Sequence, residues 1–106
     1  MESRSICFTC FDINIDLLKA KLESLQTTYA IIGKEICPST NRLHLQCYAQ
    51  FGKKFTFRKI AKALACHCEI PKGSVEENIV YCKKGGDWIE IGQVRGISKA
   101  SSNKDR

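Results

Sequence analysis

The chain has 106 residues, which is room for one compact domain with one modest hydrophobic core. Hydrophobic residues make up 43% of the sequence and charged residues 26%, so the composition excludes a wholly disordered chain. No apolar run approaches the roughly 20 residues of a membrane-spanning helix, and the N-terminus lacks the pattern of a secretory signal. The seven cysteines are an odd number without a sign of export, so we expect reduced thiols.

The net charge of +6 is concentrated in one third of the chain. Residues 52–84 carry eight basic and three acidic side chains, a net charge of +5, whereas residues 1–51 carry five of each. A basic excess in one region favours a polyanionic partner, most often a nucleic acid. A lysine-rich face that contacts only solvent would give the same balance.

The first half of the chain predicts a strand, a helix and two further strands. Residues 5–11 are rich in β-branched and aromatic side chains, which is typical of a strand. Asp12 can cap a following helix, in which isoleucine and leucine recur at steps of three and four residues. A second strand is expected over residues 29–35, with a turn at 38–41. The third strand alternates clearly, with His44, Gln46, Tyr48 and Gln50 on one face and Leu45, Cys47, Ala49 and Phe51 on the other.

The second half predicts a helix, a short strand, a second helix and a final strand. We expect the third strand to end at residues 52–54 and a helix to follow over 56–64. A short strand is expected over 66–70, and Ser74 with Glu77 has the form of a capping box that starts another helix. The last strand is expected over residues 88–91.

This order of elements predicts an α+β domain with a central, mainly antiparallel sheet of about five strands and flanking helices packed against one face. Residues 1–95 would form the domain. Residues 96–106 are rich in Ser, Lys and Asn, and we expect a flexible tail or a linker there.

The polar face of the third strand contains candidate metal ligands. His44 and Gln46 are two residues apart, so both side chains point the same way from a rigid strand. Glu35, at the end of the preceding strand, could add a carboxylate if the two strands pair. An imidazole, an amide and a carboxylate suit Mg²⁺ or Mn²⁺ better than zinc. A lone histidine on a strand is nevertheless more often an ordinary hydrogen-bonded residue.

Tyr81 and Lys84 form a second candidate pair. Residues three apart share one face of a helix, so the phenol and the ammonium group can approach one phosphate together. A tyrosine hydroxyl has an ordinary pKa of about 10, and a nearby cation or a polarised phosphate is needed to make it a nucleophile. In most proteins such a tyrosine would simply be a core or surface aromatic residue.

Two further groups of residues are candidates for binding. The basic and aromatic run over residues 53–59 could hold a phosphate backbone and stack bases, although Phe55 and Phe57 could equally dock a helix. Its cationic residues are Lys53, Lys54, Arg58 and Lys59. Cys7 and Cys10 have the spacing of a zinc ligand pair, but an offset of three in a strand sends the two thiols to opposite faces, which disfavours zinc.

Together these segments resemble the endonuclease domain of the replication-initiator (Rep) proteins of small circular single-stranded DNA viruses and satellites. Those proteins belong to the HUH endonuclease superfamily, here in the variant with Gln in place of the second His, and the resemblance is closest to the circovirus, nanovirus and alphasatellite type. It runs from about Cys7 to Gly92. The matching motifs are Cys7-Phe8-Thr9, Gly33-Lys34-Glu35, His44-Leu45-Gln46, Lys72-Gly73-Ser74 and Tyr81-Cys82-Lys83-Lys84.

The resemblance implies a sequence-specific, divalent-metal-dependent endonuclease and nucleotidyltransferase that starts and ends rolling-circle replication. Tyr81 would attack the scissile phosphodiester of a stem-loop origin and leave a 5′-phosphotyrosine and a free 3′-hydroxyl. His44, Gln46 and Glu35 would hold Mg²⁺ or Mn²⁺, and Lys84 would position the phosphate. The resemblance also implies the RRM/ferredoxin-like HUH fold, action in the host nucleus without a membrane, and self-association of a full-length protein.

The sequence also departs from this family in two places. It contains no GxxxxGK[ST] phosphate loop of the helicase domain that follows in relatives. The first motif continues into Cys10-Phe11-Asp12, where relatives usually have Leu-Asn-Asn.

A different class of function stays open, namely a non-catalytic module that binds single-stranded nucleic acid with an RNA-recognition-like sheet. Such a module predicts aromatic side chains on the exposed sheet face for stacking bases. Here that face carries His44 and Gln46, with Tyr48 as its one aromatic residue on this strand, so the sequence favours the enzyme.

Overall fold

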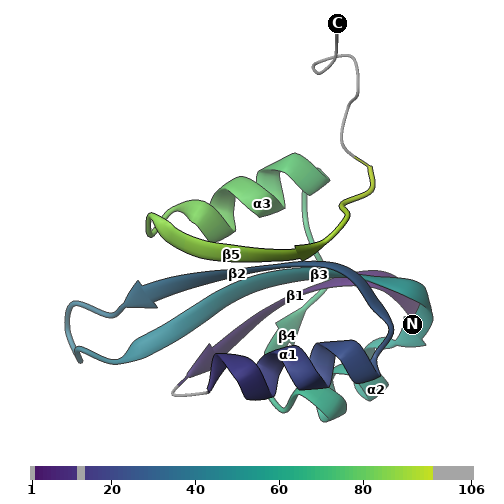
Figure 1. The fold of residues 1–106 in the computed structure, drawn as a ribbon, viewed down its shortest axis with the longest axis horizontal. Coiled ribbons are helices and arrows are strands. Elements are labelled where there is room, and N and C mark those ends of the chain that lie inside the picture. Colours follow the sequence, from purple (N-terminus) through teal and green to yellow (C-terminus); the bar gives the residue numbers. More distant parts are fainter. Residues whose placement is uncertain (1, 12–13, 97–106) are drawn as a thin grey trace, which may run out of the picture.

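The computed structural model describes residues 2–11 and 14–96, which form one five-stranded sheet and three helices (Figure 1). The sheet has the order β4-β1-β3-β2-β5, and every pair of neighbouring strands is antiparallel. The predicted α+β class and order of elements are therefore confirmed. The elements are β1 (Glu2–Phe11), α1 (Ile15–Ser24), β2 (Thr27–Ile36), β3 (Leu43–Thr56), α2 (Phe57–Leu64), β4 (His67–Glu69), α3 (Val75–Lys83) and β5 (Asp87–Gly92).

Side chains at the helix N-termini explain where the helices begin. The Asn14 side chain accepts hydrogen bonds from the backbone of Asp16 and Leu17 and so caps α1, whereas the predicted cap, Asp12, lies outside the described residues. The capping box of Ser74 and Glu77 at the start of α3 is confirmed in both of its hydrogen bonds. None of the helices in the described residues has the length and apolar character needed to cross a membrane.

Strand β3 is longer than the sequence predicted. We expected it to end at residues 52–54, but it continues to Thr56 because β1 also extends and pairs with it there. Phe55 is buried in the core, and this burial holds the end of the strand against the sheet. The lysines at 53 and 54 are therefore part of a strand and not of a turn.

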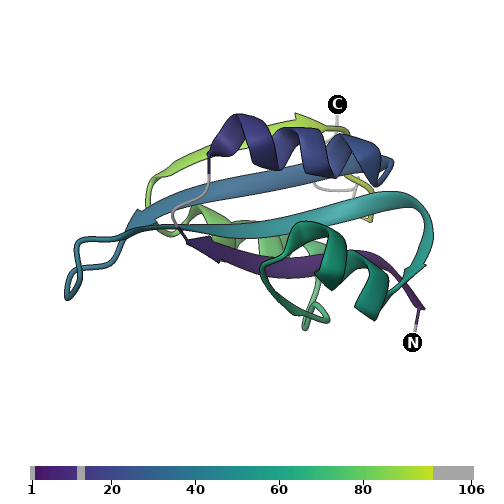
Figure 2. The ribbon, with the colours of Figure 1, turned by 90° about the horizontal axis from the view of Figure 1, so that it is seen from below.

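Helices cover both faces of the sheet, which corrects the expectation of a single covered face. Helices α1 and α2 lie on one face, over the larger core (Figure 2), and α3 lies on the other (Figure 1). The face under α3 also carries large apolar side chains, and α3 shields them from water. The predicted polar face of β3 is thus buried at Tyr48 and Gln50, and this second core comprises Tyr29, Ile31, Tyr48, Ile79 and Cys82.

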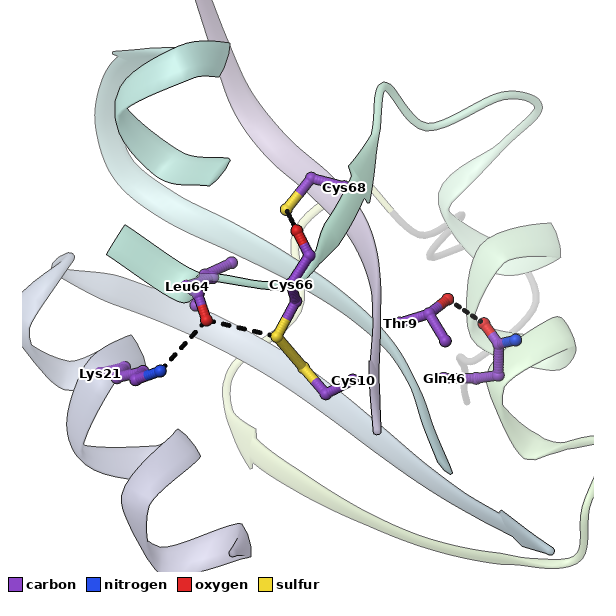
Figure 3. Close-up of a disulfide and its surroundings, with 7 residues drawn as sticks. All are labelled: Thr9, Cys10, Lys21, Gln46, Leu64, Cys66 and Cys68. Atoms are coloured by element: carbon purple, nitrogen blue, oxygen red, sulfur yellow. Dashed lines mark hydrogen bonds between the residues drawn. A yellow bond between two sulfur atoms is a disulfide. The ribbon is translucent and has the colours of Figure 1, made fainter. Parts of the chain in front are cut away.

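One pair of cysteines forms a disulfide, so the expectation that all thiols are reduced was wrong for this pair. Cys10 in β1 and Cys66 just before β4 are bonded to each other on the α1/α2 side of the sheet (Figure 3). The antiparallel pairing of β1 with β4 brings their Cα atoms to 5.2 Å, within the usual range for a disulfide. Cys7 faces the other side, as its offset of three from Cys10 predicted.

Candidate functional site

Two neighbouring rows of side chains cross the sheet at its α3 face. Strand pairing places Phe11 opposite His44 and His44 opposite Glu35, so these three residues form the first row. Thr9, Gln46 and Gly33 form the second row in the same way. Directly opposed residues in antiparallel strands share a face. The pairing of β2 with β3 therefore brings the three predicted metal ligands to one place.

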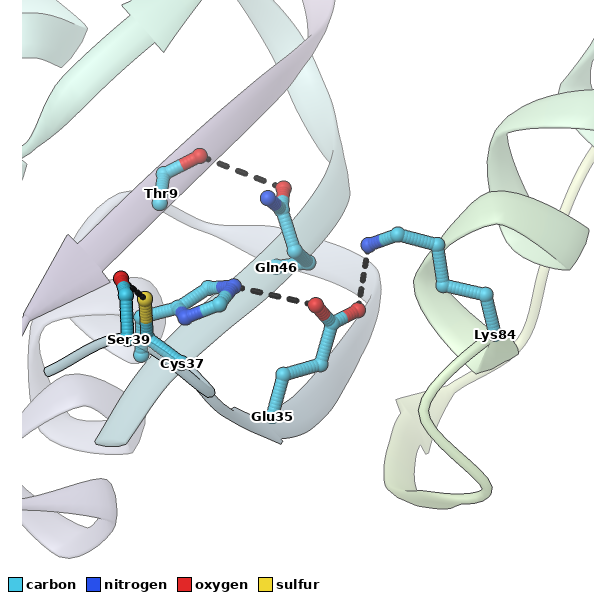
Figure 4. A network of polar contacts seen from close by, with 7 residues as sticks. Thr9, Glu35, Cys37, Ser39, Gln46 and Lys84 are labelled. Atoms are coloured by element: carbon cyan, nitrogen blue, oxygen red, sulfur yellow. Dashed lines mark hydrogen bonds and ion pairs between the residues drawn. The ribbon is translucent and has the colours of Figure 1, made fainter. Parts of the chain in front are cut away.

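Lys84 connects this part of the sheet to α3. The His44 Nε2 atom lies 3.0 Å from Glu35 Oε1, and the Lys84 ammonium group forms an ion pair with the other carboxylate oxygen (Figure 4). The side chains of His44 and Glu35 are only 16% and 15% exposed, so solvent screens their interaction weakly. Because Lys84 directly follows the last residue of α3, its ion pair also fixes the end of that helix beside the sheet.

Two glycines allow α3 to approach β2 this closely. A Cβ atom on Gly33 would overlap the carbonyl oxygen of Cys82, so the backbone of α3 rests directly on the strand at this position. A Cβ atom on Gly85 would lie 2.7 Å from the Glu35 side chain, which is also too close. Any larger residue at position 33 would therefore push the end of α3 away from the candidate metal ligands.

Tyr81 is the accessible tyrosine of this chain. All three tyrosines lie in the described residues, and Tyr29 and Tyr48 are each 2% exposed whereas Tyr81 is 54% exposed. The Tyr29 hydroxyl also donates a hydrogen bond to Glu90, and burial raises its pKa. The Lys84 ammonium lies 4.1 Å from the centre of the Tyr81 ring, as the shared helix face predicted.

A pocket of about 560 Å³ between α3 and strands β1, β3 and β4 is lined by both Tyr81 and Gln46. The Cys7 and Cys82 thiols also line it. Burial raises the pKa of Cys7 to about 11 and that of Cys82 to about 12, so both thiols are protonated and weakly nucleophilic at neutral pH. Tyr81 is therefore the most accessible candidate nucleophile at this pocket.

The donor atoms of the first row fit a small, hard cation. Metal–oxygen distances of about 2.1 Å place neighbouring ligands of an octahedral Mg²⁺ about 3 Å apart, the separation found between His44 Nε2 and Glu35 Oε1. Gln46 Oε1 lies on the adjacent row, where it accepts a hydrogen bond from the Thr9 hydroxyl at 3.2 Å (Figure 4). Within residues 2–11 and 14–96 no group of three His, Cys, Asp or Glu side chains could hold a metal ion, so a three-ligand set here needs the Gln46 amide.

The predicted DNA-binding residues are not part of this arrangement. Lys53 and Lys54 lie near the end of β3, about 30 Å along the strand from His44 at about 3.3 Å per residue. Arg58 and Lys59 lie in α2, on the opposite face of the sheet from α3. The ammonium groups of Lys53 and Lys59 both lie over the Phe55 ring, at 5.3 and 5.5 Å. The role of this group in binding stays a prediction.

Sequence reasoning missed three contributors to the site: Thr9, Phe11 and Arg42. Thr9 holds the Gln46 amide, and the Phe11 ring lies 5.7 Å from the His44 ring. The Arg42 guanidinium carbon lies 4.9 Å from the centre of the Phe11 ring. The alternation in β1 contained a usable signal, because the core residues Ile6, Phe8 and Cys10 leave Cys7, Thr9 and Phe11 on the site face.

Comparison with known proteins points to viral replication proteins. Residues 3–85 match the family model described as "Putative viral replication protein". The replication-associated protein of Human associated cyclovirus 1 is 35% identical over 94 residues, which cover 84% of this chain and 33% of that protein. The replication-associated protein of Porcine circovirus 2 is 40% identical over 76 residues, covering 69% and 24%. Para-Rep C2 of Milk vetch dwarf C2 alphasatellite is 33% identical over 98 residues, covering 87% and 34%. The chain thus spans about a third or less of the length of these curated relatives.

Proposed function

Since the chain belongs to this family of viral replication proteins, we propose that it nicks and rejoins single-stranded DNA at a stem-loop origin and so starts and ends rolling-circle replication. The nucleophile in this proposal is the Tyr81 hydroxyl. A bond forms between the tyrosine oxygen and phosphorus as the bond between phosphorus and the 3′ oxygen breaks. The phenol proton leaves to solvent, and the departing 3′ oxygen gains a proton. The product is a 5′-phosphotyrosine, which the 3′-hydroxyl of a DNA end can later attack to rejoin the strand.

The other residues of the site would orient the phosphate and balance its charge. His44, Glu35 and Gln46 would hold a divalent cation, and bound Mg²⁺ or Mn²⁺ would supply Lewis-acid polarisation of the phosphate oxygens. Lys84, with its ammonium group between the Tyr81 ring and the Glu35 carboxylate, would stabilise negative charge at the phenol oxygen and at the phosphate. Thr9 would hold the Gln46 amide in place through its hydrogen bond to the amide oxygen.

The observation that supports this proposal most strongly is the link that Lys84 makes. The Lys84 side chain contacts both the ring of Tyr81 on α3 and the carboxylate of Glu35 on β2. Tyr81 and Glu35 are 46 positions apart in the sequence (81 minus 35). Proximity of this kind is what in-line attack on one phosphodiester requires.

The burial of Tyr48 favours the enzyme over a binding module. An RNA-recognition-like module needs exposed aromatic rings in the middle of its sheet, but Tyr48 is 2% exposed and packs against α3 residues in the second core. The open part of the same face carries His44 and Gln46, and its exposed Phe11 ring lies at the end of β1 and not in the middle of the sheet.

The test is to incubate the chain with a library of stem-loop single-stranded DNAs and Mn²⁺, and then to look for protein bound covalently to DNA on a denaturing gel. We expect an adduct with the unchanged chain and none with Tyr81→Phe, which lacks the attacking oxygen. Sequencing of the captured strand would give the origin.

Thermal unfolding serves as the control, because Tyr81 is exposed and its hydroxyl has no hydrogen bond that supports the fold in the described residues. The two proteins should unfold at the same temperature. An adduct that persists in Tyr81→Phe would refute the proposed nucleophile.

A further inference from the structure

The end of β1 presents an exposed aromatic ring beside His44. Phe11 is the last residue of the strand, and its side chain is 51% exposed. It is paired with His44 in the sheet, and the centres of the two rings are 5.7 Å apart with an angle of 40° between their planes. The Arg42 guanidinium carbon lies 4.9 Å from the centre of the Phe11 ring.

Packing within residues 2–11 and 14–96 does not explain this ring. The fully buried β1 residues Ile6, Phe8 and Cys10 all point to the opposite face and are at most 2% exposed. On the same face as Phe11, Cys7 is partly buried against the second core. Phe11 belongs to neither of the two cores. A single exposed apolar side chain is common on protein surfaces, so its exposure alone does not indicate a ligand. Its position beside the candidate metal ligand His44 and under the Arg42 guanidinium is what indicates one.

We propose that the Phe11 ring and the Arg42 guanidinium form a stacking site for one unpaired nucleobase of the DNA strand that is cut. This inference rests on the proposed function, since it takes the scissile phosphate to lie at His44 and Glu35. Because the Phe11 and His44 rings are neighbours in one row of the sheet, the stacked base belongs to a nucleotide that adjoins this phosphate.

The chemistry of the two groups fits a nucleobase with its attached phosphates. Every base has a π face that can stack on phenylalanine, whatever its identity, and single-strand-binding proteins commonly use this interaction. The Arg42 guanidinium lies over the ring, and it can also contact an adjacent phosphate oxygen. An apolar partner such as a leucine side chain would use the ring but would gain nothing from the cation.

The experiment measures DNA binding separately from cleavage. All proteins carry Tyr81→Phe, and EDTA is present, so neither the nucleophile nor a metal contributes to the result. The ligand is the origin oligonucleotide captured in the preceding experiment, labelled for fluorescence anisotropy. A series of oligonucleotides carries one abasic nucleotide at each position on either side of the cut.

We expect one abasic position that adjoins the cut to weaken binding by about 5- to 150-fold, the usual loss for one stacked base. Phe11→Ala should weaken binding of the intact oligonucleotide by a similar factor. In that variant the abasic position should cause no further loss, because the base has no ring left to stack on. Phe11→Trp should restore both the affinity and the abasic effect.

Leu17→Ala is the matched control, since Leu17 is 52% exposed but lies in α1 on the other side of the sheet. It should bind DNA like the parent. The stacking site is refuted if Phe11→Ala binds like Leu17→Ala, or if every abasic position has the same effect with and without the Phe11 ring. If Tyr81 forms the adduct but this coupling is missing, only the stacking site fails. If no variant binds single-stranded DNA, the proposed function fails with it.

Discussion

The two ends of β3 differ in how their charged groups are held. At the first end, His44 contacts Glu35, and Glu35 contacts Lys84, so each of these side chains has a fixed partner. At the C-terminal end of the strand, Lys53 and Lys54 are exposed, and the Lys53 ammonium lies over the Phe55 ring. We therefore propose that the first end carries out the reaction and that the C-terminal end attracts the DNA backbone.

The run with the most basic residues is therefore not the part of the chain that contains the candidate site. Half of the eight basic residues behind the net charge of +5 over residues 52–84 lie in the run at residues 53–59. The site at the other end of β3 instead depends on one lysine from the same region, Lys84, which α3 carries to the sheet. The following predictions test whether the two ends have these separate roles.

The largest effect is expected at His44. His44→Ala removes a proposed metal ligand and the contact with Glu35 Oε1, so cleavage should fall by about a thousandfold. EDTA should stop cleavage by the unchanged chain, and added Mn²⁺ should restore it. Initial cleavage rates at increasing Mn²⁺ concentration would measure both effects.

His67→Ala is the control for this prediction, since His67 is the other histidine and pairs with Glu69 at 3.2 Å in an exposed position. It should keep the Mn²⁺ dependence of the unchanged chain. Cleavage that survives EDTA at its full rate would remove the metal from the account.

The next largest effect is expected at Gly33. Gly33→Ala places a methyl group where the Cys82 carbonyl lies, so the end of α3 must shift and carry Tyr81 and Lys84 with it. A displacement of about 1 Å costs about a hundredfold in rate. Gly52→Ala is the comparison, because a Cβ atom there would lie 3.4 Å from its nearest neighbour, and it should cleave normally. Equal cleavage rates for the two variants would show that the close approach of α3 is not needed.

A smaller effect is expected at Lys84. A preorganised charge contributes about 10²- to 10³-fold to a rate, but the Lys84 side chain is 41% exposed, so we expect Lys84→Ala to lose about tenfold. Lys84→Arg should recover part of the rate. Lys83→Ala should have no effect, because the Lys83 ammonium lies over Trp88, 5.0 Å from the ring centre. Single-turnover cleavage rates would distinguish these variants, and a loss at Lys83 equal to that at Lys84 would contradict the assigned role.

The smallest effect on the reaction is expected at the other end of β3. The double variant Lys53→Ala and Lys54→Ala should bind DNA more weakly. The slope of log affinity against log salt concentration should become shallower by about 1.4, since each lost phosphate contact on single-stranded DNA removes about 0.7. Its cleavage rate at saturating DNA should not change. Anisotropy titrations at several salt concentrations would measure the slope, and an unchanged slope would mean that the DNA lies elsewhere.

Local patterns were sufficient to predict the elements and which candidate residues lie on one face. The alternation from His44 to Phe51 predicted β3 and the shared face of His44 and Gln46, and the Ser74 capping box predicted the start of α3. The spacing of Tyr81 and Lys84 predicted their contact. Each of these features depends on residues that are close in the sequence.

Features that join distant segments could not be predicted in the same way. The disulfide of Cys10 and Cys66 depends on the pairing of β1 with β4, which no local pattern contains. The position of α3 over the second face depends on Gly33, whose role is visible only once Cys82 is placed against it. The ring of Phe11 beside His44 likewise requires the register of β1 with β3.

The central claim is that Tyr81 is the residue that becomes joined to DNA, and peptide mass spectrometry of the trapped adduct tests it most directly. After digestion of the DNA with nuclease and of the protein with trypsin, the peptide of residues 73–83 should carry the nucleotide, with fragmentation placing the phosphate on Tyr81. Tyr29 and Tyr48 lie in other tryptic peptides, which should be unmodified. A nucleotide on any other residue, or cut DNA with no protein attached, would contradict the account.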